Sequence, residues 1–142
     1  MAATSAEFSL EKDTTNNLAP STAMFQATLQ GLTVYFQLIR LRNSCFLWIG
    51  DSARRVDALS VALPNPFDNK APLVTAITDR RTNDAQPVRD EGQQIAAKLS
   101  RKLGAQVFVT YNVAEASEES DLLTAIEAHL FSLIKNGVAF TL

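Results

Sequence analysis

The sequence predicts an α+β domain in which a mostly antiparallel sheet of five to six strands carries two helices packed on one face. Between residues 24 and 78 the chain consists of short β-branched and aromatic runs separated by Gly, Pro and Asn, the pattern of strands joined by turns. Between residues 87 and 137, two stretches repeat Leu, Ile and Ala at helical spacing around one further strand. Strands first and helices late is the order typical of an α+β fold.

The most regular strands are predicted at residues 33–42 and 44–49, joined as a hairpin. The first is TVYFQLIRLR, which ends at Arg42, and the second lies in SCFLWIGD, which begins after Asn43. Pro64-Asn65-Pro66 is expected to break the chain, so residues 64–72 are predicted to be a loop. The remaining strands are expected at 24–30, 58–63, 72–78 and 106–111, with a loop at 79–86.

Each predicted helix has recognisable ends. The first is expected to start near Pro87, whose missing N–H costs nothing in a first turn, and to stop at Gly104. The second is expected to start after Ser117 as N-cap and to stop at Asn136-Gly137. Both carry an apolar stripe, so they pack on the sheet.

The length of 142 residues fits one domain. Residues 1–20 are rich in Ala, Ser, Thr and Asn, and such a segment gains too little burial to offset its ordering entropy. We therefore expect a flexible tail over 1–20 and a single domain over 21–142.

The predicted hairpin assigns side chains to faces, because directly opposed residues share a side. With Arg42 and Asn43 as the turn, Ile39 faces Phe46 and Gln37 faces Trp48. One face then carries an aliphatic set suited to lie beneath the helices: Val34, Phe36, Leu38, Cys45, Leu47 and Ile49. The opposite face carries Tyr35, Gln37, Ile39, Leu41, Phe46 and Trp48.

Neither face alternates with polar residues as a half-solvated sheet should. Two helices cover one face only, so we expect a partner protein to cover the face of Tyr35, Phe46 and Trp48. In the alternative, the N-terminal tail or the C-terminal stretch VAFTL folds over it. A register slip by one residue would exchange the two faces.

Residues for catalysis are sparse. The only histidine, His129, lies beside Leu130 without a second residue at metal-ligand spacing, and the single cysteine, Cys45, sits within an apolar strand. The five glycines are scattered, so no phosphate-binding loop is indicated. We expect no enzyme activity, no catalytic or metal-binding residues and no cofactor.

Charge and cysteine content restrict the partners and the compartment. A net charge of −2 argues against nucleic acid, whose binders carry a basic face. No apolar run has the length of a membrane span, and one cysteine fits a reducing compartment. The protein is expected to be soluble, off the membrane, and located in the cytoplasm or also the nucleus.

Three stretches resemble the proteasome assembly chaperone 4 family: LIRLRNSCFLWIGD at 38–51, GQQIAAKLSRKLG at 92–104 and QVFVTYN at 106–112. The resemblance runs in order from about Met24 to about Lys135. The tail and the 64–72 segment match no family motif, so the resemblance suggests no role for either segment.

The resemblance implies a non-catalytic chaperone that pairs with a cognate assembly chaperone 3 subunit and helps 20S proteasome α-subunits form a ring. It also implies sheet-on-sheet pairing between outer helices. Two other functions stay open: a small-molecule-binding or enzymatic domain with Tyr111 or Asp79 at the rim of a pocket, and a homodimeric scaffold. The sequence does not decide whether the chain forms a homodimer when the partner is absent.

Overall fold

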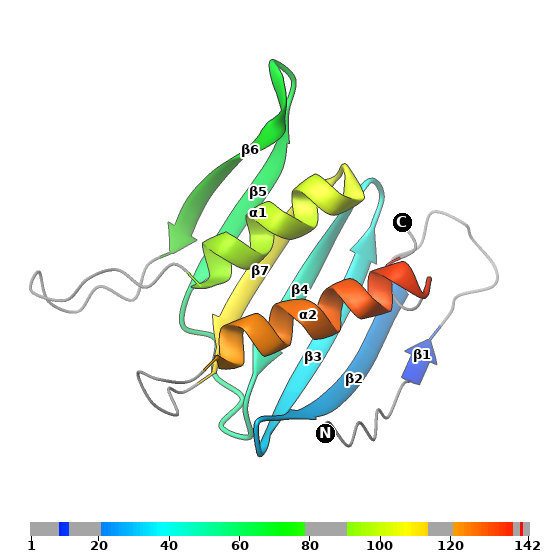
Figure 1. Cartoon of the computed structure of the whole chain (residues 1–142), viewed down its shortest axis with the longest axis vertical. Helices are drawn as coiled ribbons and strands as arrows, with labels where there is room; N and C mark the ends of the chain where they lie inside the picture. Colours follow the sequence, from blue (N-terminus) through cyan, green and yellow to red (C-terminus); the bar gives the residue numbers. More distant parts are fainter. Residues whose placement is uncertain (1–8, 12–20, 79–90, 114–120, 138–139, 141–142) are drawn as a thin grey trace, which may run out of the picture.

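A computed structural model describes residues 9–11, 21–78, 91–113, 121–137 and 140 of the chain. Within these residues lie seven strands and two helices (Figure 1). The strands are β1 (Ser9–Glu11), β2 (Ser21–Leu29), β3 (Leu32–Leu41), β4 (Ser44–Gly50), β5 (Leu59–Asn65), β6 (Asp68–Thr78) and β7 (Gln106–Asn112). The helices are α1 (Glu91–Leu103) and α2 (Leu122–Lys135).

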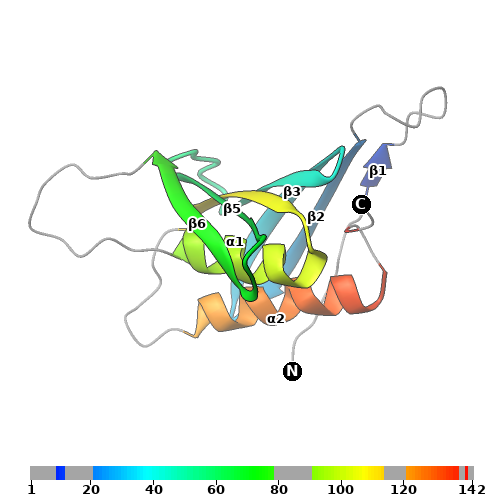
Figure 2. The same ribbon diagram turned by 90° about the horizontal axis from the view of Figure 1, so that it is seen from above.

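All seven strands form one sheet in the order β1-β2-β3-β4-β7-β5-β6. Neighbouring strands are antiparallel except β4 and β7, which run parallel and join the two halves of the sheet. Both helices lie on one side of the sheet (Figure 2). The predicted α+β class with two helices on one face is thus confirmed.

The predicted tail contains a strand that the sequence did not indicate. Ser9–Glu11 forms β1 and pairs antiparallel with β2, which raises the sheet to seven strands instead of the predicted five to six. A three-residue strand is too short to show an alternating pattern, and main-chain pairing with the edge of β2 requires none. The rest of residues 1–20 lies outside the described residues, so the division of the chain at residue 20 stays a prediction.

The segment predicted as a loop at 64–72 is instead part of a long hairpin. β5 pairs with β7 only from Ser60 to Ala62, while its pairing with β6 continues to Asn65 and Asp68. The register shifts between Leu63 and Asn65, so Pro64 lies at an irregularity, beyond the end of the β7 pairing, where its missing N–H is tolerated. We call residues 63–73 the arm, because it extends past β7 (Figure 1).

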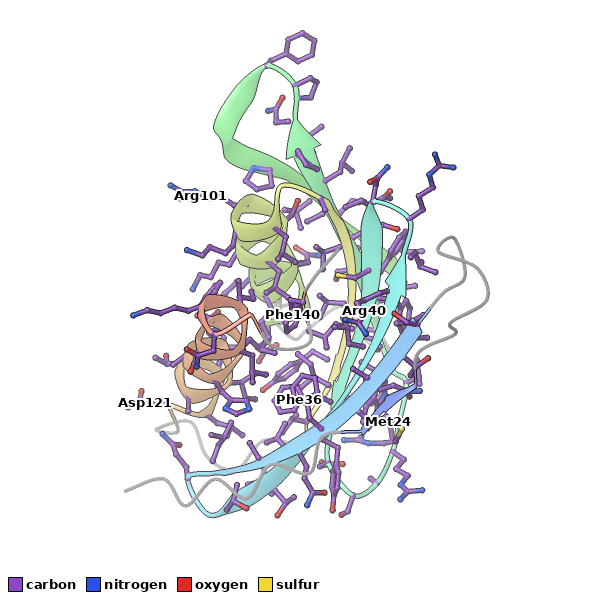
Figure 3. All side chains as sticks on the ribbon, turned by 90° about the vertical axis from the view of Figure 1, so that its right-hand side faces the viewer. Met24, Phe36, Arg40, Arg101, Asp121 and Phe140 are labelled. Carbon is purple, nitrogen blue, oxygen red and sulfur yellow. The ribbon has the colours of Figure 1, made fainter. Side chains whose placement is uncertain are left out.

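The core lies between the sheet and the helices. Val34, Phe36, Leu38, Cys45, Leu47 and Ile49, the set predicted for the helix side, are all buried there. Ile95 and Leu99 of α1 and Ile126 and Leu130 of α2 pack against them. Figure 3 shows Phe36 between sheet and helices and Met24 on the other side.

The ends of the helices agree with the sequence where the structure describes them. Gly104 and Gly137 have φ of 63° and 70°, the left-handed conformation that glycine adopts without strain after a helix. Pro87, Ser117 and the predicted 79–86 loop lie outside the described residues. Neither described helix is long and apolar enough to cross a membrane.

Replacing a leucine should affect stability according to the face it occupies. Leu47 is fully buried beneath the helices, whereas Leu73 is 49% exposed. We expect Leu47→Ala to lower the free energy of unfolding by about 2–5 kcal/mol and Leu73→Ala by less than about 1 kcal/mol. Urea denaturation followed by circular dichroism measures both. Equal losses would contradict the assignment of the core.

Candidate protein interface

The face of the sheet opposite the helices, which we call the outer face, carries all six predicted interface residues. The register of β3 and β4 pairs Ile39 with Phe46, Gln37 with Trp48 and Leu41 with Ser44, as the hairpin predicts. Tyr35 lies on the same side and pairs with Gly50. The structure therefore brings the six side chains together, and their role as an interface stays a prediction.

These side chains are neither buried nor freely solvated. Leu41 is 38% exposed, and the other five are half-buried by their neighbours on the sheet. The ring of Phe46 stacks beside that of Phe108 on β7, with centroids 6.5 Å apart. The outer face is thus an apolar surface that its own residues cover only in part.

The outer face extends beyond the residues that the sequence identified. Met24 pairs with Gln37 across β2 and β3, Phe108 pairs with Phe46, and Val61 pairs with Phe108. Met24 is 55% exposed. The two-residue turn at Gln30-Gly31 would have placed Met24 beside Gln37 from sequence alone, whereas no local signal predicts the parallel pairing that brings in Phe108.

Trp48 is fixed by contacts within the chain at one end of the outer face. Its Nε1 donates a hydrogen bond of 2.9 Å to the carbonyl oxygen of Arg55. The indole lies over Gly50, where an added Cβ would come within 2.3 Å of the ring. Residue 50 must therefore be glycine, because any side chain would displace the indole.

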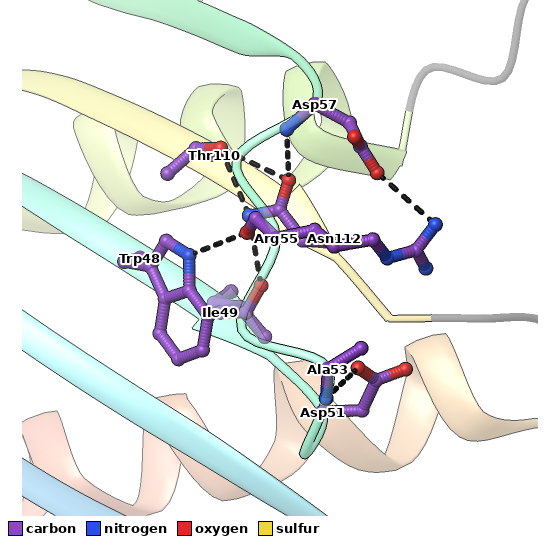
Figure 4. Close-up of polar contacts among 8 residues, drawn as sticks. All are labelled: Trp48, Ile49, Asp51, Ala53, Arg55, Asp57, Thr110 and Asn112. Atoms are coloured by element: carbon purple, nitrogen blue, oxygen red, sulfur yellow. Dashed lines mark hydrogen bonds and ion pairs between the residues drawn. The ribbon is translucent and has the colours of Figure 1, made fainter.

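Asn112 fastens the segment after β4 to the end of β7 (Figure 4). Its Nδ2 donates to the carbonyl oxygen of Ile49 at 3.3 Å, and its Oδ1 accepts from the backbone N–H of Asp57 at 2.6 Å. Arg55 forms an ion pair with Asp57 at 3.4 Å. Residues 51–57 therefore close this end of the outer face, where Thr110 and Asn112 are buried.

The termini do not cover the rest of the outer face in the described part of the chain. Phe140, from the predicted covering stretch VAFTL, is buried in the core cluster on the helix side. β1 extends the edge of the sheet beside β2. The remaining residues of both termini lie outside the described residues.

Groups that could support chemistry are buried without activation. Burial raises the pKa of the Cys45 thiol to about 12, so the thiolate that reacts as a nucleophile is disfavoured. Burial, followed by the negative charge of Glu91, raises the pKa of Tyr111 to about 12. Tyr111 lies against Gly92 of α1, and Asp79 lies outside the described residues. Among the described residues, no three His, Cys, Asp or Glu side chains gather to hold a metal.

His129 packs on aromatic rings of the core instead of facing a site. Its ring centroid lies 5.7 Å from that of Phe36 and 6.4 Å from that of Phe25. Nε2 is buried without a hydrogen-bond partner, and burial lowers the pKa of the imidazole. His129 is therefore a histidine at the boundary of the core.

These features define a class of protein: a two-layer α+β domain whose sheet has one face packed beneath helices and the other apolar and half-exposed. Comparison with known proteins identifies the family. The family model described as proteasome assembly chaperone 4 matches residues 33–113, more than half of the chain. The chain belongs to the proteasome assembly chaperone 4 family.

Two relatives in sequence agree with this assignment. The proteins named proteasome assembly chaperone 4 from Mus musculus and Homo sapiens are each 32% identical over 99 residues, spanning 70% of this chain and 74% of the relative. A chain from the crystal structure of a novel chaperone complex for yeast 20S proteasome assembly has a TM-score of 0.49 at 14% identity. That match covers 81% of this chain and 91% of the yeast chain.

Removing the Asn112 side chain should release residues 51–57. Asn112→Ala leaves the Asp57 N–H and the Ile49 carbonyl without their partner, and we expect a loss of about 1–3 kcal/mol in the free energy of unfolding. Because Trp48 is the only tryptophan, its emission should shift to the red as the indole gains water. Asn136→Ala, at an exposed position after α2, is the matched control and should change neither quantity.

Stability should fall on acidification because of His129. Its pKa in the folded chain lies below 6.5, so on acidification below that value the unfolded chain takes up a proton before the folded chain does. The histidine's contribution is fully present above pH 6.5 and is lost as pH falls through the folded pKa. His129→Gln should flatten the change in the free energy of unfolding between about pH 7.5 and pH 5.5, measured by urea titration. Parallel profiles for both proteins would contradict this.

Proposed function

We propose that this chain is a non-catalytic assembly chaperone subunit that pairs with a cognate proteasome assembly chaperone 3 through its outer face. The pair then promotes assembly of the 20S proteasome α-ring by binding α-subunits. The proposal places the protein in the cytoplasm or the nucleus. Family membership supports the chaperone role, and the outer face carries the argument for pairing.

The outer face has the composition of an interface. Its apolar side chains cross the sheet from Met24 on β2 to Phe108 on β7, and their half-burial leaves surface for a partner to cover. Completing the burial of Ile39 or Phe46 would contribute on the order of 1 kcal/mol each. Several such side chains together are needed to offset the cost of association.

A second sheet is the partner shape that fits this surface best. Apolar side chains on neighbouring strands form a continuous layer, and two such layers interdigitate when sheets pack face to face. The helices would then lie outside on both subunits. Trp48, fixed by Gly50 and the Arg55 carbonyl, offers a rigid aromatic surface at the rim of this layer.

Charges on the outer face should prevent pairing. We expect Ile39→Glu with Phe46→Glu to weaken binding to assembly chaperone 3 by at least roughly 100-fold, because each carboxylate would be buried without a partner. Val56→Glu, at a 70% exposed position after β4, is the control and should bind as the wild type does. Co-expression, gel filtration with mass measurement and calorimetry supply the readouts.

Trp48 is not the residue to test first, since its loss would also disturb residues 51–57. Circular dichroism establishes that the doubly substituted chain is folded. Full binding by the folded double variant would remove the outer face from the proposal. A wild-type chain that forms only a stable homodimer in the presence of assembly chaperone 3 would favour a homodimeric scaffold instead.

A further inference from the structure

Basic side chains gather at the end of the sheet where β4 and β7 begin. The parallel register of Ser44 with Gln106 brings the β3–β4 turn, with Arg42, beside the connection from α1 to β7. Arg101 and Lys102 occupy the last turn of α1, and Lys135 occupies that of α2, which runs in the same direction (Figure 1). We call Arg42, Arg101, Lys102 and Lys135 the basic end.

All four side chains of the basic end are exposed, and none forms an ion pair in the described part of the chain. The carboxylates of Asp51, Asp57, Glu91 and Asp121 lie at the opposite end, together with Arg54 and Arg55. Among the remaining acidic residues, Glu127 pairs with Lys98, and Asp68 follows Phe67 in the arm. The helix dipoles favour Lys and Arg in a last turn. They do not account for Arg42, which lies in a strand turn.

The arm projects from the basic end and presents an aromatic side chain at its tip. Phe67 is 96% exposed, more than any other large apolar residue that the structure describes. Its backbone N–H donates to Oδ1 of Asn65 at 2.9 Å, a hydrogen bond that stabilises the turn. An exposed aromatic ring at the tip of a turn is suited to enter a pocket on a partner.

We propose that the basic end and Phe67 form one docking surface for a protein that presents carboxylates beside an apolar recess. On the proposed function, on which this inference rests, that protein is an α-subunit of the 20S proteasome. The basic end has four cations, and the chain as a whole has a net charge of −2. This charge suits a partner with protein carboxylates better than nucleic acid, whose negative charge is denser. The docking surface lies at one end of the sheet, whereas the outer face is one of its two broad faces. An α-subunit and assembly chaperone 3 can therefore bind at the same time.

Site-specific cross-linking tests the position of Phe67. The probe is the complex of this chain with assembly chaperone 3, carrying p-benzoylphenylalanine at residue 67 and mixed with each purified 20S α-subunit in turn. Irradiation should produce a covalent adduct with an α-subunit. The same photoreactive residue at position 56, which is exposed at the opposite end, is the control and should produce none.

Affinity measurements on the same complex test both parts of the surface. We expect Phe67→Ser to weaken α-subunit binding roughly 30-fold and Arg101→Gln with Lys102→Gln to weaken it about tenfold, with the charge effect shrinking in high salt. Val56→Ser is the control for Phe67→Ser. The control for Arg101→Gln with Lys102→Gln is Gln30→Glu with Thr124→Glu. This pair changes the net charge by the same amount at exposed positions away from the basic end.

The outcomes separate this inference from the proposed function. If the wild-type complex binds no α-subunit, the proposed function fails and the inference fails with it. If the wild-type complex binds an α-subunit and the Phe67 and Arg101/Lys102 variants bind it equally well, only the inference is overturned. Equal losses in the control variants would likewise overturn it, because the effect would not depend on position.

Discussion

The pairing of β4 with β7 is the contact on which the rest of the structure depends. It is the one parallel ladder among the described strands, and it joins the β1–β4 half of the sheet to the β5–β6 hairpin. Parallel neighbours need a crossover connection, and α1 lies within that connection. A helix is thereby held on one face, and no helix covers the apolar side chains of β4 that point to the other face.

β4 shows how one strand serves two layers. Cys45, Leu47 and Ile49 point to the helices and are fully buried, whereas Phe46 and Trp48 point to the outer face and are half-buried. A strand with this pattern is usual where both faces of a sheet are covered. In this chain residues 51–57 cover only the end near Trp48, through the Arg55 carbonyl and Asn112. The remaining apolar surface is the one that we propose as an interface.

Local signals made much of this arrangement predictable from the sequence. A two-residue turn fixes the register of a hairpin, so Arg42-Asn43 was sufficient to sort β3 and β4 into two faces. Gly104 and Gly137 marked the ends of the helices. The core set and the six predicted outer-face residues followed from these turns.

Features that depend on distant partners were not predictable in the same way. Phe108 joins the outer face through β7, which is remote from β4 in sequence. Pro64 is a strong turn signal, yet the structure accommodates it at a register shift in the arm, because no strand pairs there on the β7 side. Each failure has the same cause: whether a proline or an aromatic residue is tolerated depends on which strand lies next to it.

The contrast between the outer face and Phe67 bears on how the two surfaces can act. Side chains of the outer face are already half-buried, so each gains only part of its transfer free energy on binding, and a stable contact requires many of them over a wide area. Phe67 is almost fully exposed on a short turn. This single side chain therefore gains most of its transfer free energy when a small contact buries it. A broad surface suits a lasting pairing between subunits, whereas a small aromatic and basic contact is weak enough to form and dissociate. On the proposed function, the outer face would therefore suit the permanent partner and Phe67 the temporary one.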